Sequence, residues 1–223
     1  YTWRTKKAEI VEYMQQLTQT ESREYYRPNF WPNTPDILPY HLHGRNNNAF
    51  FLRLAMAATL TSSYGVYGPV YEFGFNESFH GKEEYFNSEK YEVQHFNWNE
   101  RNRLTHLMTL LNNMRRNNTA LQTTWNIQFS ETNNEHLFSY YKISDDTEGG
   151  AKNIIWCIAN LDTENTQNGY VEVPKTAFNI KGEVNIKVED LLTGEIYNWT
   201  NDWNFVELNP YKSPLHIFKV HIL

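Results

Sequence analysis

One acidic residue of this chain of 223 residues stands in an unusually stiff and polar setting. Asp36 lies in the stretch RPNFWPNTPDILPY, residues 27–40, which is rich in proline, aromatic residues and asparagine. Each proline fixes its own φ angle and favours extended geometry in the residue before it. Residues 29–31 are therefore predicted to form a strand, and residues 33–36 the turn that leaves its end. This setting suits a catalytic carboxylate, and it equally suits an ordinary turn, since aspartate beside proline is a common turn former.

Two clusters nearby have side chains that could bind a metal ion. His41 and His43 are spaced like a pair of ligands, but no third ligand is evident, and exposed histidines are common in such a turn. A calcium site needs several oxygen ligands in a tight loop, and the glutamates that follow lack that spacing. We predict no metal site and interpret these glutamates as a solvated rim: Glu72, Glu77, Glu83, Glu84 and Glu89.

Tryptophans and the single cysteine allow both a chemical and a structural interpretation. The tryptophans that could stack on sugar rings are Trp98, Trp125, Trp199 and Trp203. Core packing is the favoured interpretation, because an indole buries a large area. Cys157 lies in the apolar run Ile-Ile-Trp-Cys-Ile, which predicts a buried strand thiol rather than a nucleophile.

Composition excludes several classes of protein. The formal net charge of −6 leaves no basic face for phosphates, so we predict no nucleic-acid partner. The longest apolar candidate, residues 49–60, is shorter than the roughly 18–20 residues of a membrane span and contains Arg53, so we predict no membrane segment. A lone cysteine is typical of a reducing compartment and predicts a cytoplasmic location. The opening YTWRTKKAEIVEYM has neither an initiator methionine nor a leader, which predicts that the chain continues a longer protein.

The periodicity of apolar residues divides the chain into two parts. Helical spacing starts at Thr5, which is a candidate cap, and recurs over residues 47–61 and 100–117, with strands expected at 28–31 and 62–71. After about residue 120 the pattern changes to short alternating strands separated by turn residues. These strands are expected at 137–142, 153–161, 170–174, 184–191, 195–200, 205–208 and 216–222. The fold class is therefore α/β followed by an antiparallel β-sandwich.

The order of these elements and the sequence motifs within them resemble those of a known family. The segments YTWRTKKAEIVEY, YRPNFWPNTPDIL, AATLTSSYGVYGPVYEF, EEYFNSEKYEV and RNRLTHLMTLLNNMRRNNTALQ resemble the C-terminal part of glycoside hydrolase family 13. Within that family they are most similar to the maltosyltransferases that extend an α-1,4-glucan from maltose 1-phosphate. The later segments DLLTGEIYNWT and NFVELNPYKSPLHIFKV resemble the C-terminal sandwich of the same proteins.

The resemblance implies a fold and a division into domains. Members of the family carry a (β/α)8 barrel with catalytic residues at the C-terminal ends of its strands. Residues 1–121 would supply the last two βα units of that barrel, and residues 122–223 the β-sandwich. The rest of the barrel would belong to a preceding N-terminal part of the same protein.

The resemblance also implies roles for particular residues. Asp36 matches the third carboxylate of the family, which stabilises the oxocarbenium-like transition state rather than attacking the sugar. Lys90 and Tyr91, in SEKYEV, match positions that border the donor sugar. The nucleophile and the acid/base of the family would both precede Tyr1, so the chain alone is expected to be inactive. The implied partners are an α-glucan and maltose 1-phosphate, with no metal or organic cofactor, and the parent protein would be a homodimer.

Two other interpretations remain open at this point. An α-amylase-type hydrolase or an isomerase of the same family is disfavoured by Pro35, because amylases usually place histidine directly before this aspartate. A non-catalytic module is the second alternative, in which the sandwich binds glucan and the α/β part is a remnant.

Overall fold

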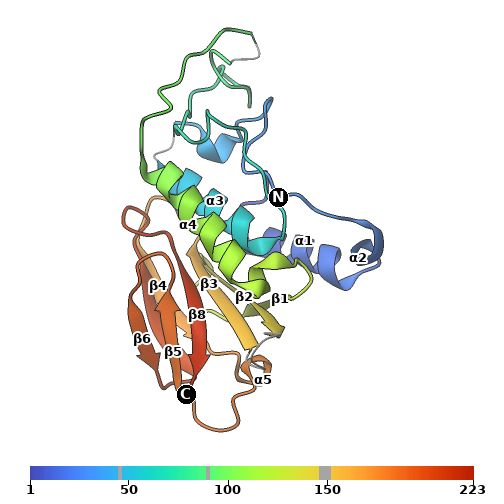
Figure 1. Cartoon of the computed structure of the whole chain (residues 1–223), viewed down its shortest axis with the longest axis vertical. Coiled ribbons are helices and arrows are strands. Elements are labelled where there is room, and N and C mark those ends of the chain that lie inside the picture. The colour runs from blue at the N-terminus through green and yellow to red at the C-terminus, as the bar shows by residue number, and fades with distance from the viewer. Residues whose placement is uncertain (45–46, 89–90, 146–151) are drawn as a thin grey trace.

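The chain folds into a helical and loop-rich region packed on a β-sandwich (Figure 1). The computed structural model describes residues 1–44, 47–88, 91–145 and 152–223. The helices are α1 (Lys7–Gln19), α2 (Ser22–Tyr25), α3 (Asn47–Leu60), α4 (Arg103–Asn117) and α5 (Lys175–Phe178), with short 3-10 turns at Tyr40–Leu42 and Thr119–Gln122. No helix within these described ranges is long and apolar enough to cross a membrane.

The sandwich consists of two antiparallel sheets. The larger has six strands in the order β1-β2-β3-β8-β5-β6, and the smaller pairs β4 with β7. Their bounds are β1 (Ile127–Ser130), β2 (Leu137–Asp145), β3 (Lys152–Asn160), β4 (Gln167–Glu172), β5 (Ile186–Asp190), β6 (Ile196–Trp199), β7 (Trp203–Leu208) and β8 (Leu215–Ile222). Strand β1 was not expected from the sequence, whereas the other seven fall within a few residues of their predicted positions.

The central strands β2 and β3 are covered on both faces of the six-stranded sheet, so they are buried along most of their length. Phe138 and Cys157 face the helices, in a core that also contains much of α3 and α4. Tyr141 and Trp156, which lie three residues after Phe138 and one residue before Cys157, face the small sheet in a second core. Because successive side chains of a strand point to opposite faces, the same two strands serve both cores.

Helix α3 is the centre of the helical region. It is apolar on all sides, as expected of a helix buried all round. Basic side chains from other elements contact the backbone at its C-terminal end: Arg115 of α4 donates to the carbonyls of Thr61 and Ser62, just after the helix, and the amine of Lys142 of β2 lies 3.5 Å from the carbonyl oxygen of Leu60. Positive groups at a helix C-terminus satisfy its unpaired carbonyls and interact favourably with its dipole.

The first residues of the chain are fastened to α3 as well. Arg53 is buried and donates to the carbonyl oxygens of Tyr1 and Arg4, each at 2.7 Å. Thr5 was predicted to cap α1, but it does not. Instead, the carboxylate of Glu9 accepts from the backbone nitrogens of Thr5 and Lys6, each at 3.3 Å.

The stretch predicted as a strand at 62–71 is mostly irregular, and the expectation of an extended strand there is wrong. A single parallel bridge joins Phe30 to Tyr64, and turns begin within a few residues. Gly65 is required at this point, because a Cβ atom there would lie 2.6 Å from the ring of Trp31. Pro69, which has no N–H to donate, cannot continue a ladder.

Candidate functional site

Asp36 sits at the tip of a tight turn. The backbone nitrogen of Thr34 donates to the carbonyl of Ile37 at 3.1 Å, and that of Ile37 donates back to Thr34 at 3.2 Å. Pro35 and Asp36 span the tip and are exposed. The predicted turn is confirmed, and the backbone pairing on either side holds Asp36 at an exposed tip.

The surroundings of Asp36 include one of the other predicted site residues. Asp36 and Tyr91 line the same shallow recess of about 440 Å³, together with Ile37, Glu83 and Glu84. Tyr91 is 65% exposed, and its backbone nitrogen donates to the carbonyl of Ser88 at 2.9 Å. Lys90 lies outside the described residues. The structure thus brings Asp36 and Tyr91 together, although they are far apart in the sequence.

A buried asparagine fixes the start of this turn, and sequence analysis missed it. Asn33 is fully buried, and its amide nitrogen donates to the carbonyl of Tyr67 at 3.0 Å and to the hydroxyl of Tyr85 at 2.7 Å. Its amide oxygen accepts from the backbone nitrogen of Tyr67 at 2.9 Å. Burial raises the pKa of the Tyr85 phenol, so that hydroxyl stays neutral. Asn33 therefore ties the Asp36 turn to two loops at once.

Glu83 fastens the far side of the turn. One carboxylate oxygen accepts from the backbone nitrogen of Tyr40 at 2.8 Å, and the other accepts from the indole nitrogen of Trp3 at 2.9 Å. The carbonyl of Glu83 also accepts from the backbone nitrogen of Leu38 at 2.9 Å. This glutamate was interpreted as part of a solvated rim, and that interpretation is wrong for Glu83, because its oxygens join three segments of the chain. Glu89 lies outside the described residues.

In the neighbouring histidine pair, His43 has no free ring nitrogen for a metal. The ring nitrogens of His43 are both used within the protein, one 2.7 Å from the carbonyl of Leu38 and the other 3.0 Å from the hydroxyl of Ser78. No cluster of three or more histidines, cysteines or carboxylates suited to a metal ion is found among the described residues.

The aromatic residues and the cysteine follow their predictions only in part. Trp199 packs against Trp156 with ring centroids 5.3 Å apart, which confirms core packing for this residue. Trp98 and Trp203 are 66% and 41% exposed, so core packing is wrong for them, and Trp125 is half-buried. Cys157 is the buried strand thiol that was predicted, and burial raises its pKa to about 12, which leaves it without a nucleophilic thiolate.

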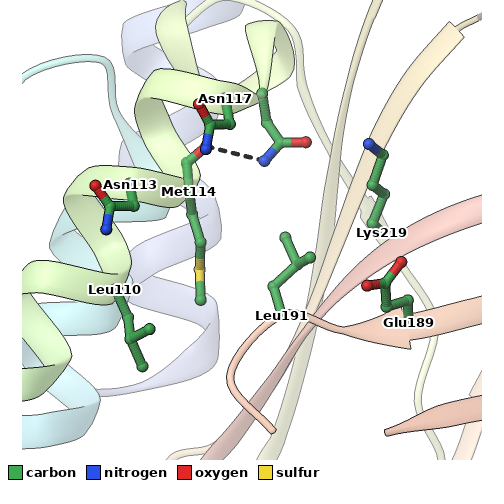
Figure 2. Close-up of a pocket in the computed structure, with 8 residues that line it drawn as sticks. Leu110, Asn113, Met114, Asn117, Glu189, Leu191 and Lys219 are labelled. Atoms are coloured by element: carbon green, nitrogen blue, oxygen red, sulfur yellow. Dashed lines mark hydrogen bonds between the residues drawn. The ribbon is translucent and has the colours of Figure 1, made fainter. Parts of the chain in front are cut away.

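A further recess lies between α4 and the sandwich (Figure 2). It has a volume of about 310 Å³ and is lined on one side by Asn113 and Asn117 and on the other by Glu189 and Lys219. None of the residues assigned to the site from the sequence lines it. It is a small gap of mixed polar and apolar lining in the contact between helix and sheet.

Comparison with solved structures shows which fold the chain shares. The chain is similar in fold to the noncanonic maltogenic α-amylase AmyB from Thermotoga neapolitana, with a TM-score of 0.65 over 98% of this chain and 46% of that one. The sequence identity is 12%, so the likeness concerns the fold alone. The architecture is that found in part of an α-amylase.

Sequence comparison identifies the family. The model described as "GLGE, C-terminal" matches residues 129–220. The α-1,4-glucan:maltose-1-phosphate maltosyltransferases of Chlorobaculum tepidum and Methylacidiphilum infernorum are 43% and 37% identical over 100% and 99% of this chain. The chain spans about a third of the length of these relatives, 33% and 32%. It belongs to the α-1,4-glucan:maltose-1-phosphate maltosyltransferase family and corresponds to the C-terminal portion of its members.

Proposed function

We propose that this chain is the C-terminal segment of an enzyme that moves maltose from maltose 1-phosphate to the non-reducing end of an α-1,4-glucan and releases phosphate. The observation that carries the proposal is the 43% identity over the whole chain to a protein named for that transfer. The recess shared by Asp36 and Tyr91 supports it, because both residues were assigned to the site from the sequence.

The helical region supplies the last two βα units of a (β/α)8 barrel in this proposal. The backbone nitrogen of Phe30 donates to the carbonyl of Ser63, and that of Gly65 donates to the carbonyl of Phe30, each at 3.0 Å. This parallel contact, with α3 as the connection between its two sides, is the arrangement of a βαβ unit. Residues 1–121 would then be the end of the barrel, and residues 122–223 the following sandwich domain.

Asp36 would act on the transition state. Its carboxylate accepts hydrogen bonds from sugar hydroxyls and favours the positive charge that develops at the anomeric carbon. The contacts of Asn33 and Glu83 suit this role, because a misplacement of about 1 Å can cost on the order of a hundredfold in rate. Lys90 and Tyr91 would border the bound maltosyl unit.

The remaining chemistry belongs to the preceding part of the parent enzyme. Retention requires a nucleophilic carboxylate and an acid/base with carboxyl groups roughly 5–5.5 Å apart. In the proposed double displacement, the nucleophile replaces phosphate at the anomeric carbon, and the acceptor hydroxyl then replaces the nucleophile. No metal or organic cofactor enters this scheme. The parent is proposed to be a cytoplasmic homodimer, and residues 1–223 alone are expected to be inactive.

Phosphate release tests the proposal. The full-length parent is incubated with maltose 1-phosphate, with and without glycogen, and inorganic phosphate is measured. We expect release that depends on glycogen, and no release by residues 1–223 alone. Release of reducing sugar from starch without use of maltose 1-phosphate would instead identify a hydrolase, and the transferase proposal would be wrong.

A further inference from the structure

The sandwich has a cleft of its own at the mouth between its two sheets. It lies between strand β6, at the edge of the large sheet, and strand β7 of the small sheet, and has a volume of about 530 Å³. We name it the mouth cleft and define it by Glu195, Tyr197, Trp199, Phe205, Glu207, Lys212, His216 and Phe218. In Figure 1 the bounding strand β6 lies in the lower half, whereas the loop of residues 73–88 lies at the top.

One wall of the mouth cleft is aromatic. The ring of His216 stacks on that of Phe218 with centroids 4.7 Å apart, and Trp199 and Tyr197 meet Phe218 edge-on at 5.5 and 6.0 Å. Phe205 forms part of the rim and is 55% exposed. These rings hold one another in place, so the wall is preformed.

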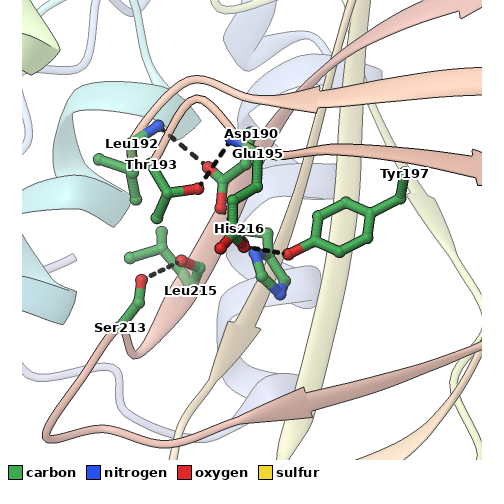
Figure 3. A network of polar contacts seen from close by, with 8 residues as sticks. All are labelled: Asp190, Leu192, Thr193, Glu195, Tyr197, Ser213, Leu215 and His216. Atoms are coloured by element: carbon green, nitrogen blue, oxygen red, sulfur yellow. Dashed lines mark hydrogen bonds and ion pairs between the residues drawn. The ribbon is translucent and has the colours of Figure 1, made fainter.

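Polar groups on the same wall are fixed by contacts within the protein (Figure 3). Asp190 is fully buried, binds Nδ1 of His216 at 2.7 Å, and accepts from the backbone nitrogen of Leu192 at 3.0 Å. The imidazole is thereby held in one orientation, with Nε2 as the ring nitrogen that Asp190 does not engage. Tyr197 donates its hydroxyl to Glu195, and this hydrogen bond raises the pKa of Tyr197 to about 12.

The charges around the cleft select the class of ligand. Glu195 and Glu207 are exposed carboxylates at the rim, and Lys212 is the cation that lines it. Two carboxylates against one ammonium disfavour a phosphate or another anion. Rings that present apolar surface, beside carboxylate acceptors, suit a neutral molecule with apolar ring faces and many hydroxyl groups, which is a sugar.

We propose that the mouth cleft binds a segment of an α-glucan chain. The choice of an α-glucan among sugars rests on the proposed function. Because the cleft is separate from the recess of Asp36, a glucan held there keeps its chain ends near the enzyme without entering the chemistry. Such tethering raises the effective concentration of a polymeric acceptor and does nothing for a short one.

The test compares glucan binding by variants of the full-length parent. Phe205→Ala removes the exposed ring, and Glu207→Gln removes one rim charge; both side chains are exposed, so the fold should be retained. Tyr25→Ala is the matched control, since Tyr25 is 74% exposed on α2. Binding is measured by retardation in native gels that contain glycogen, and inorganic phosphate serves as an anionic probe for competition.

We expect Phe205→Ala to weaken glycogen binding by about fivefold to tenfold, and Glu207→Gln by about threefold. The KM for glycogen should rise in parallel, while the KM for maltose 1-phosphate and the rate with a short maltooligosaccharide should not change. Tyr25→Ala should behave like the wild type, and phosphate should not compete with glycogen.

Two results would overturn the proposal. One is glycogen retardation of Phe205→Ala and Glu207→Gln within twofold of the wild type. The other is displacement of glycogen by inorganic phosphate in the gel. Failure of the proposed function would look different, because the wild-type parent would then release no phosphate from maltose 1-phosphate whatever its affinity for glycogen.

Discussion

The two regions of the molecule hold their polar groups by different means. Around Asp36, residues 61–88 and 91–102 form neither helix nor extended strand, and the contact of Phe30 with Tyr64 is an isolated bridge. In the sandwich, by contrast, strands pair over long registers, such as all nine residues of β2 with β3. The loops around Asp36 are joined by side chains, whereas the polar groups of the sandwich rest on a ladder of backbone hydrogen bonds.

This difference indicates that the two regions contribute differently to activity and to stability. A loop fastened by a few buried side chains can hold an exposed carboxylate in a fixed position, as functional loops on a rigid scaffold commonly do. A ladder with aromatic packing on both faces is better suited to stability. Substitution of the exposed Asp36 should therefore change activity more than stability, and substitutions in the buried core of the sandwich should do the reverse.

The largest effect on activity is expected for Asp36→Asn. In the full-length parent this change should slow phosphate release by on the order of a thousandfold, because a preorganised charge at the transition state is lost. The free energy of unfolding should stay within about 0.5 kcal/mol of the wild-type value, since the side chain is exposed. Glu100→Gln removes an exposed carboxylate elsewhere and serves as the control. Activity of Asp36→Asn within tenfold of the wild type would remove this residue from the site.

The largest effect on stability is expected for Trp156→Ala. Trp156 is fully buried, packs edge-on against Phe178 and Trp199, and donates to the hydroxyl of Ser139 at 2.8 Å. Its removal should cost about 3–5 kcal/mol in urea unfolding. Trp203→Ala, at a position that is 41% exposed, should cost less than about 1 kcal/mol. Equal costs for the two changes would contradict the assignment of the sandwich core.

Asn33→Ala tests the connection between the loops. It leaves the carbonyl and the backbone nitrogen of Tyr67 and the hydroxyl of Tyr85 without their amide partner. We expect a loss of about 1–3 kcal/mol in unfolding free energy and a fall in kcat of the full-length parent, since the Asp36 turn loses its support. Asn99→Ala, at an exposed position, is the control. A loss of stability with full kcat would show that Asn33 supports the fold alone.

Lys142 makes the stability of the chain depend on pH. Burial, with Arg115 nearby, lowers the pKa of its ammonium from 10.5 to about 7. Between pH 7 and pH 10 the unfolded chain retains a proton that the folded chain has lost, so this residue makes unfolding free energy rise with pH.

Lys142→Met should remove that rise. The melting temperature of the variant should exceed that of the wild type most clearly below pH 7, and the difference should narrow toward pH 10. Each 1 kcal/mol of difference in unfolding free energy corresponds to about 2–4 °C in melting temperature. Lys181→Met, which replaces an exposed lysine, should show no such trend. A constant gap at every pH would mean that Lys142 is not desolvated as described.

The sequence predicted those structural features that depend on residues close together along the chain. The Asp36 turn follows from the prolines around it, and the strands of the sandwich follow from alternating apolar residues. The prediction of a strand at 62–71 was wrong because the apolar and aromatic residues there indicate burial but do not determine whether the backbone pairs with another strand.

The side-chain contacts that hold the Asp36 turn in place could not be predicted from such local patterns. Asn33 meets Tyr67 and Tyr85, which are 34 and 52 residues away, and Glu83 meets Trp3 at a separation of 80. No periodicity relates positions so far apart. The same holds for Asp190 and His216, because aspartate before a Leu-Leu-Thr-Gly turn looks like an ordinary turn residue until β5 and β8 are seen to pair.

The length of the glucan product is the most direct measure of the central account, in which this chain completes a maltosyl-transferring enzyme. The full-length parent is incubated with maltose 1-phosphate and a maltooligosaccharide of defined length, and the products are resolved by mass spectrometry. We expect a ladder that grows in steps of two glucose units, with one phosphate released for each step. Products that grow by single glucose units, or that only shorten, would contradict the account.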